Sequence, residues 1–204
     1  MSPAYWSQAL TALSERDTVL ETLIRQHRSR TLQPRGDAFV TLARSIIGQQ
    51  LSVKAAQSIW QRLHDNVGTI EPGAIVNTDV DQLRGQGLSA NKAAYLIELA
   101  ERFLDGSLDA AKWHQCEDEE VIKELTAVRG VGRWTADMFL IFCLLRPNVL
   151  PLGDVGLQRA MRVHYNNGKP LSKLKIRRIT RQWEPWCTVA TWFMWRSLDA
   201  QPTA

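Results

Sequence analysis

The sequence predicts an all-α protein of about ten helices, arranged as two lobes around a cleft. Three observations support this prediction. Apolar residues recur at helical spacing along nearly the whole chain, helix-capping residues stand where these stretches begin, and no stretch alternates as a β-strand does. Hydrophobic residues make up 45% of the 204 residues and charged residues 23%, a balance that favours a packed core over disorder. We expect residues 1–204 to form a single domain.

Capping residues mark most helices in the first half of the chain. The helical pattern begins almost at the first residue. Ser and Asp side chains accept hydrogen bonds from the first unpaired N–H groups of a helix, and Thr does so more weakly. We therefore expect helices after Asp37 and Ser52, a short one from Thr78 to near Gly85, and another after Ser89.

The second half contains the most apolar segment. Trp134–Leu145 is apolar on nearly all sides, which predicts a central buried helix that Pro147 prevents from continuing. A shorter helix, Val121–Val128, is expected just before it. Further helices are expected from Val155, near Ser172, and from Trp186 to Leu198.

Between the helix ending near Val128 and the buried helix lies the turn Gly130-Val131-Gly132. Two glycines separated by one residue let the backbone take positive φ and expose its N–H groups. A helix starting at Arg133 points the positive end of its dipole the same way, so the turn predicts an anion site. A DNA phosphate is its natural ligand, with a Na⁺ or K⁺ ion at residues 128–132 as a further expectation. The alternative is an ordinary glycine-capped helix connection.

Asp154 stands where a later helix begins, in Leu150-Pro151-Leu152-Gly153-Asp154. An aspartate there is commonly a helix N-cap. The same position favours its ionised form, and a carboxylate beside a sugar can stabilise the oxocarbenium-like state of N-glycosidic cleavage. The two roles are compatible.

A helix–hairpin–helix at about 118–145, a Gly/Pro-containing loop and then Asp154 resemble the superfamily of DNA glycosylases named for these features, the HhH-GPD superfamily. Within it, the chain is most similar to the 3-methyladenine DNA glycosylase II type. The resemblance covers about Asp37 to Leu198 and includes two further segments, Arg44–Ser52 and Gly87–Ala93.

The resemblance implies a base-excision repair enzyme that flips alkylated purines out of damaged double-stranded DNA and hydrolyses their N-glycosidic bond. It implies Asp154 as the catalytic carboxylate and Gln50 or Leu51 as the wedge that fills the gap in the duplex. Trp134, Met138 and Trp195 are the implied base pocket, whose aromatic faces attract a cationic base. The expected phosphate contacts are Gly130, Val131, Gly132, Arg129, Arg133 and Thr135.

Two departures from other members of the superfamily argue against a lyase reaction and against an iron–sulfur cluster. Trp134 stands where bifunctional members have a lysine, so we expect no lyase activity. Cys116, Cys143 and Cys187 cannot supply four thiolates, so no iron–sulfur cluster is expected, and no catalytic metal or organic cofactor. The family often has a pocket tyrosine where this chain has Met138, which leaves the accepted bases open.

The remaining expectations concern context. The net charge of +4 is compatible with nucleic acid. A basic cluster could contact phosphates or simply be a solvated helix face; it consists of Lys173, Lys175, Arg177, Arg178 and Arg181. Unpaired cysteines and the absence of a signal-peptide pattern favour the cytoplasm, where we expect the protein at the nucleoid. We also expect a monomer. Helical periodicity near the first residue leaves no room for the N-terminal β domain of some relatives.

Three alternatives remain at this point. The first is a DNA-binding module without catalysis, because helix–hairpin–helix motifs also occur in such proteins. The second is a glycosylase for deaminated or oxidised bases, which Met138 keeps open. A bifunctional lyase is a weaker third.

Overall fold

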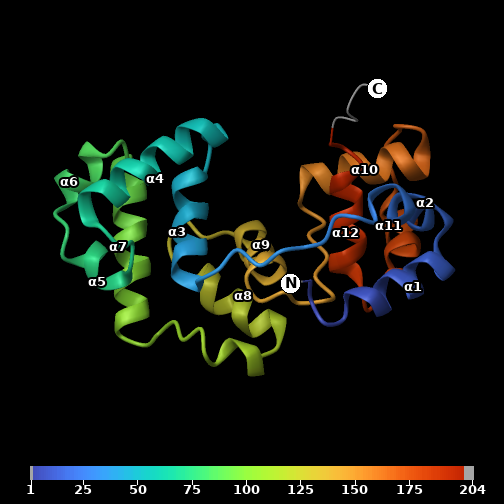
Figure 1. Ribbon diagram of the computed structural model, residues 1–204, viewed down its shortest axis with the longest axis horizontal. Coiled ribbons are helices and arrows are strands. Elements are labelled where there is room, and N and C mark those ends of the chain that lie inside the picture. The colour runs from blue at the N-terminus through green and yellow to red at the C-terminus, as the bar shows by residue number, and fades with distance from the viewer. Residues whose placement is uncertain (1, 200–204) are drawn as a thin grey trace. The chain divides into compact units, whose positions relative to one another are not determined.

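The computed structural model describes residues 2–199 and confirms the all-α prediction. The described part holds twelve α-helices, one 3-10 helix (Trp113–Gln115) and no strand (Figure 1). The helices are α1 Trp6–Arg16, α2 Thr18–His27, α3 Ala38–Gly48, α4 Val53–Val67, α5 Pro72–Val76, α6 Val80–Gly85, α7 Ala90–Leu104, α8 Asp118–Thr126, α9 Arg133–Phe142, α10 Val155–Asn166, α11 Lys173–Thr180 and α12 Cys187–Arg196. No helix in this part is long and apolar enough to cross a membrane.

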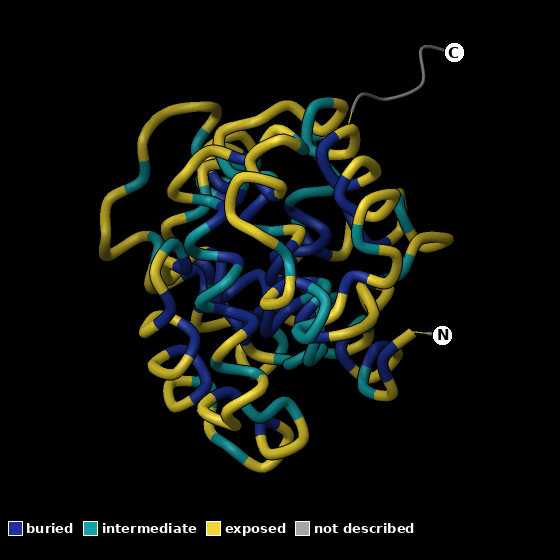
Figure 2. Tube along the Cα trace, turned by 90° about the vertical axis from the view of Figure 1, so that its left-hand side faces the viewer, coloured by how far each residue is buried: buried dark blue, intermediate teal, exposed yellow. Residues whose placement is uncertain are grey.

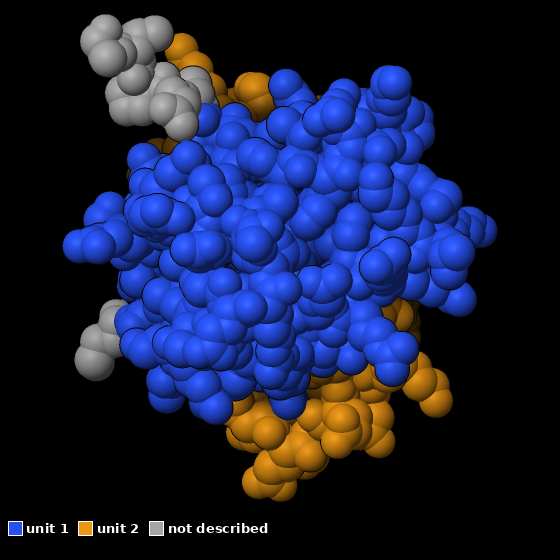
Figure 3. All heavy atoms as spheres, turned by 90° about the vertical axis from the view of Figure 1, so that its right-hand side faces the viewer, with its two compact units in different colours: residues 1–34, 140–204 blue, residues 35–139 orange. Residues whose placement is uncertain are grey.

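The chain forms two compact units, coloured separately in Figure 3. Of the described residues, unit 1 comprises 2–34 and 140–199, and unit 2 comprises 35–139. The division falls within α9, so unit 1 combines two segments far apart in the sequence with the last residues of that helix.

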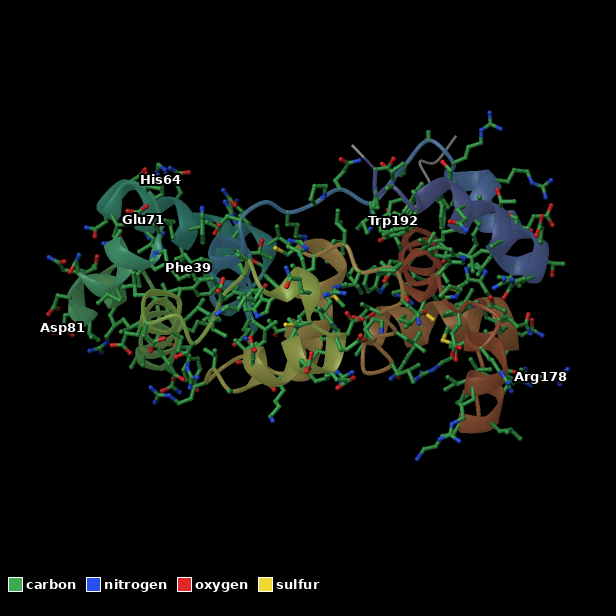
Figure 4. The ribbon with its side chains drawn as sticks, turned by 90° about the horizontal axis from the view of Figure 1, so that it is seen from below. Phe39, His64, Glu71, Asp81, Arg178 and Trp192 are labelled. Atoms are coloured by element: carbon green, nitrogen blue, oxygen red, sulfur yellow. The ribbon has the colours of Figure 1, made fainter. Side chains whose placement is uncertain are left out.

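Unit 2 is built around α3 and α7, which pack against each other, with α4 on α3 and α5 and α6 on α7. Its core includes a line of aromatic rings in edge-to-face contact. Phe39 of α3, labelled in Figure 4, lies 5.5 Å from Phe103, Phe103 lies 6.0 Å from Trp113, and Trp113 lies 5.2 Å from Phe139 of α9. Edge-to-face packing is favoured because the ring edge is positive and the ring face negative. These contacts tie α9 to the core of unit 2.

Unit 1 packs α1, α2 and α10 against α12. A buried carboxylate organises this unit. Asp17 caps α2 by accepting from the N–H groups of Val19 and Leu20, and its second oxygen accepts from the Tyr165 hydroxyl at 2.7 Å and from the Trp183 indole at 3.2 Å. Because each lone pair finds a donor, the carboxylate can be buried without an unpaired polar atom.

Local sequence signals placed most helix starts correctly. The side chains of Asp37, Ser52, Ser89, Asp154 and Ser172 each accept from a first-turn N–H group. Figure 2 shows the resulting alternation of buried and exposed stretches along the helices.

Several boundaries differ from the prediction. The helix expected over Val121–Val128 is α8, Asp118–Thr126, because Glu117 and Glu120 form a capping box at its start, and the last helix ends at Arg196 rather than Leu198. Two further differences have a visible cause. The short helix begins at Val80 and is capped by Asp79, because the Thr78 hydroxyl instead donates to the carbonyl of Ala74. The buried helix ends at Phe142 rather than Leu145. Leu145 takes a left-handed φ of +54° and the N–H of Arg146 turns back to the carbonyl of Leu140, so the helix stops before Pro147 can terminate it.

Candidate functional site

The Gly130-Val131-Gly132 turn joins α8 to α9 in unit 2, as the sequence predicts. Its two glycines have different reasons for being glycine. Gly130 has φ +82°, and a Cβ there would lie 2.2 Å from Cδ2 of Tyr95, so no side chain fits. A Cβ on Gly132 would meet nothing within 4 Å. The backbone at Gly132 is therefore open to a ligand, whereas Gly130 packs against the protein.

The backbone N–H groups of this turn have different roles. The N–H of Val131 donates to the carbonyl of Val128 at 3.1 Å, which removes it from the set that can face an anion and corrects the expectation for this residue. Thr135 is buried, so the structure does not present it at the surface of the turn. The Gly132 amide directly precedes α9, and an anion there would lie at the positive end of the helix dipole.

Both arginines beside the turn already have acidic partners. Arg129 forms an ion pair with Glu98, and Arg133 pairs with Glu119 at 2.7 Å and with Asp137 at 3.0 Å. Burial would raise the pKa of Glu98, but hydrogen bonds from Arg129 and Arg102 outweigh it and lower that pKa. Both arginine side chains remain more than half exposed. A phosphate that contacted either guanidinium group would therefore share it with the acidic partner.

The turn after α3 carries the two wedge candidates. Gln50 is exposed and takes a left-handed φ of +58°, a conformation that costs a residue with a side chain about 1–2 kcal/mol. Leu51 is 39% exposed, so it is a surface residue and not a core residue at a turn. Both side chains are thus exposed on one tight turn, and either could serve as the wedge.

Asp154 lies in unit 1 at the N-cap of α10. Its Oδ1 accepts from the N–H of Leu157 at 2.6 Å and from Nε1 of Trp195 at 2.8 Å. A Cβ on Gly156 would lie 3.1 Å from that oxygen and 3.3 Å from Cδ1 of Trp195, so this glycine leaves room for the indole. Two donors from different helices therefore orient one carboxylate oxygen.

Trp195 also has an aromatic neighbour that sequence reasoning missed. Phe142 stacks on it with ring centroids 5.8 Å apart and an interplanar angle of 14°. One face of Trp195 is therefore covered, and a base could contact only the other face or an edge. The available signal was spacing, because Phe142 follows Met138 by four residues, as Met138 follows Trp134.

The other predicted pocket residues belong to α9 in unit 2. Trp134 is 50% exposed, which is unusual for so large an apolar ring, whereas Met138 is buried.

Burial raises the pKa of the Cys187 thiol to about 12, which makes it unreactive at neutral pH. In residues 2–199, no group of three or more His, Cys, Asp and Glu side chains could hold a metal ion.

The basic cluster lies on and just after α11 in unit 1. In Figure 4, Arg178 projects away from this helix, and Lys175 donates to Oδ1 of Asn166 at 2.8 Å. Lys173 and Arg177 line a largely apolar cavity of about 390 Å³ between α10 and α11. The cluster is thus a basic surface of unit 1, and the hairpin belongs to unit 2.

The all-helical fold contains a glycine-turn hairpin, and Asp154 accepts hydrogen bonds from Leu157 and Trp195 at the start of α10. The chain belongs to the HhH-GPD superfamily of base excision DNA repair proteins, whose family profile matches residues 43–185. It is 29% identical to DNA-3-methyladenine glycosylase 1 of Schizosaccharomyces pombe, over 92% of this chain and 84% of that protein. It is also 29% identical to Bacillus subtilis YfjP, but spans only 66% of that relative's length.

Solved structures show the same relationship. The DNA-3-methyladenine glycosidase of Bacillus halodurans superposes with a TM-score of 0.85 and 33% identity, covering 94% of this chain and 89% of that one. The Schizosaccharomyces pombe 3-methyladenine DNA glycosylase Mag1, in complex with abasic DNA, has a TM-score of 0.79 and 28% identity, covering 93% and 96%. These likenesses confirm the predicted family and fold.

Proposed function

We propose that this protein is a DNA glycosylase that flips alkylated purines, of the 3-methyladenine and 7-methylguanine type, out of duplex DNA and hydrolyses their N-glycosidic bond. The observation that carries the proposal is the Asp154 carboxylate, held by two hydrogen bonds within an HhH-GPD fold. The relatives named above as 3-methyladenine glycosylases support this substrate class.

In this proposal Asp154 stabilises charge rather than forming a bond. As the bond between C1′ and the purine nitrogen breaks, its electron pair moves to the purine and cancels the positive charge that alkylation placed there. The sugar becomes oxocarbenium-like, and a fixed negative charge nearby lowers the energy of that state. Water then bonds to C1′ and gives its proton to Asp154 or to solvent, which leaves an abasic site.

The base pocket selects its substrate through charge. An alkylated purine is cationic, and aromatic faces attract cations by about 0.5–2 kcal/mol. We assign Trp134, Met138 and Trp195 to binding the base, and Phe142 supports Trp195 by stacking on it. Because the leaving base departs neutral, no strong general acid is required.

The DNA grip in this proposal uses the Gly132 amide and the first turn of α9 for one phosphate, with Na⁺ or K⁺ at residues 128–132, and the Gln50–Leu51 turn as the wedge. Unstacking a base costs a few kcal/mol, part of which a wedge offsets. We propose that the protein works as a monomer on chromosomal DNA in the cytoplasm.

One observation favours a second substrate class. The pocket tyrosine common in the family is replaced by Met138, which is buried. A thioether packs against varied shapes, so deaminated or oxidised bases are the second candidate substrates.

The proposal is tested by base release from methylated duplex DNA, resolved by chromatography. Asp154→Asn is the informative variant, because asparagine keeps an acceptor for both donors and caps helices equally well. We expect wild type to release 3-methyladenine or 7-methylguanine, and the variant to lose at least about 100-fold in rate while binding DNA normally. Asp37→Asn, at another helix N-cap, is the matched control. Full activity of Asp154→Asn would refute the role, and release of only other bases would establish the second candidate.

A further inference from the structure

One stripe of α7 contacts both of the elements that the proposed function places against DNA. The side chains recur at positions 92, 95, 98 and 102, the spacing that puts residues on one helix face. Three of them hold the hairpin. Tyr95 fills the space beside Gly130, Glu98 accepts from the N–H of Arg129, and Arg102 donates to the carbonyl of Ala127 at 3.0 Å.

The fourth member of the stripe holds the wedge turn instead. Nζ of Lys92 donates to the carbonyl of Ile47 at 2.8 Å and to that of Gln49 at 2.6 Å. These carbonyls lie at the C-terminal end of α3, where helical acceptors have no partner and a positive charge is favourable. Gln50, with its left-handed φ, follows directly. Lys92 therefore holds the backbone on the N-terminal side of the strained residue.

The wedge turn is also bonded to the hairpin directly. Nε2 of Gln49 donates to the carbonyl of Gly130 at 2.7 Å. Gln49 thus has its own carbonyl held by Lys92 while its side chain reaches the glycine that packs under Tyr95. The phosphate-binding turn and the wedge turn are consequently linked by short bonds within unit 2.

We infer that Lys92 is a positioning residue for base flipping, acting together with Gln49 to hold the wedge turn at a set distance from the phosphate held by the hairpin. This inference rests on the proposed function. It also assigns a role to the segment Gly87–Ala93, in which the Ser89 cap starts α7 so that Lys92 falls in its first turn.

The inference predicts a dependence on the DNA stack. A wedge matters where a base must be removed from an intact duplex and matters little where the stack is already interrupted. Lys92→Met should therefore slow single-turnover release of 7-methylguanine paired with cytosine by about tenfold. Release of the same base opposite a one-nucleotide gap should change less than twofold. A purely structural defect would slow both reactions equally.

Lys112→Met is the matched control, because Lys112 forms an exposed ion pair with Asp109 and its loss changes the net charge equally. Gln49→Met provides a second test if Lys92→Met folds poorly, and should show the same selective loss. Lys92→Arg, which keeps a cationic donor, should recover most of the activity on the paired substrate. Thermal midpoints of all variants report folding.

A binding measurement separates this inference from the proposed function. A duplex carrying 2-aminopurine beside a tetrahydrofuran abasic site reports wedge insertion by fluorescence and needs no excision. If wild type shows the fluorescence change but releases no alkylated base, the proposed substrate is wrong. The role of Lys92 is then supported if Lys92→Met lacks the fluorescence change. A wild-type response in folded Lys92→Met, or equal loss on paired and gapped substrates, overturns the inference.

Discussion

The Nε1 group of Trp195 donates a 2.8 Å hydrogen bond to Oδ1 of Asp154, the oxygen that also accepts from the Leu157 N–H group. The bond joins the last turn of α12 to the N-cap of α10. Phe142 stacks on the indole, and a Cβ on Gly156 would crowd it at 3.3 Å. The direction of the carboxylate thus depends on two helices rather than on the N-cap alone.

Trp195→Phe should reduce excision by about tenfold or more. Phenylalanine keeps the stack on Phe142 but loses the indole N–H, and a hydrogen bond to a charged group contributes about 1.5–3 kcal/mol. Single-turnover release of an alkylated base measures the effect. Trp186→Phe, at a half-buried tryptophan that stacks on Tyr5, is the control. An unchanged rate for Trp195→Phe would mean that the bond does not orient the catalytic oxygen.

Alanine substitution should affect a different property at each hairpin glycine: stability at Gly130 and DNA binding at Gly132. Gly130→Ala should lower the free energy of unfolding by more than about 1 kcal/mol, because its φ is positive and its Cβ would collide with Tyr95. Gly132→Ala should leave stability within about 0.5 kcal/mol but weaken binding to duplex DNA, because the methyl group obstructs a phosphate. Chemical denaturation and fluorescence anisotropy measure the two effects. Normal DNA binding by Gly132→Ala would place the phosphate elsewhere.

Gln50→Gly should separate stability from activity. Glycine relieves the left-handed strain of this residue, so stability should be unchanged or higher by up to about 1 kcal/mol. If Gln50 is the wedge, excision from paired DNA should fall while excision opposite a gap persists. Leu51→Ala tests the other candidate in the same assay. Loss of paired activity in only one variant identifies the wedge.

Glu98 should make stability depend on pH in the acid range. Its folded-state pKa is lowered: burial alone would raise that pKa, but the bonds from Arg129 and Arg102 outweigh it. A lowered pKa stabilises the fold above the unfolded-state value, and the contribution is lost as pH falls through the folded-state value. Glu98→Gln should therefore cost about 1–2 kcal/mol at neutral pH and progressively less as the pH falls below the unfolded-state pKa of glutamate, about 4.3. Denaturation curves across this range provide the check, and a pH-independent difference would contradict it.

Wild-type enzyme should form no covalent adduct when borohydride is added during turnover. The position of the lyase lysine is occupied by Trp134, which has no amine to form a Schiff base with the sugar. Gel electrophoresis of enzyme with labelled damaged duplex detects an adduct directly. A trapped species would require another nucleophile and would revive the bifunctional alternative.

Local patterns predicted much of this protein because they act over one or two helical turns. Ser52, Ser89 and Asp154 cap helices through bonds to residues three positions away, and Gly130 and Gly132 mark a turn by their spacing. The helix class, the hairpin and the family could therefore be predicted without coordinates. Helix boundaries were misplaced where a competing bond was not visible in the pattern, as with the Thr78 hydroxyl.

The sequence by itself predicted the helical class, the glycine turn of the hairpin and the place of Asp154 at a helix start, because each depends on neighbours along the chain. Tertiary structure decided which residues from distant parts of the sequence contact one another. Phe142 covering Trp195, the Trp195 bond to Asp154, and Lys92 reaching Ile47 and Gln49 join residues between 41 and 53 positions apart. Such contacts depend on how helices pack, and packing is set by the burial of many side chains together rather than by any local spacing.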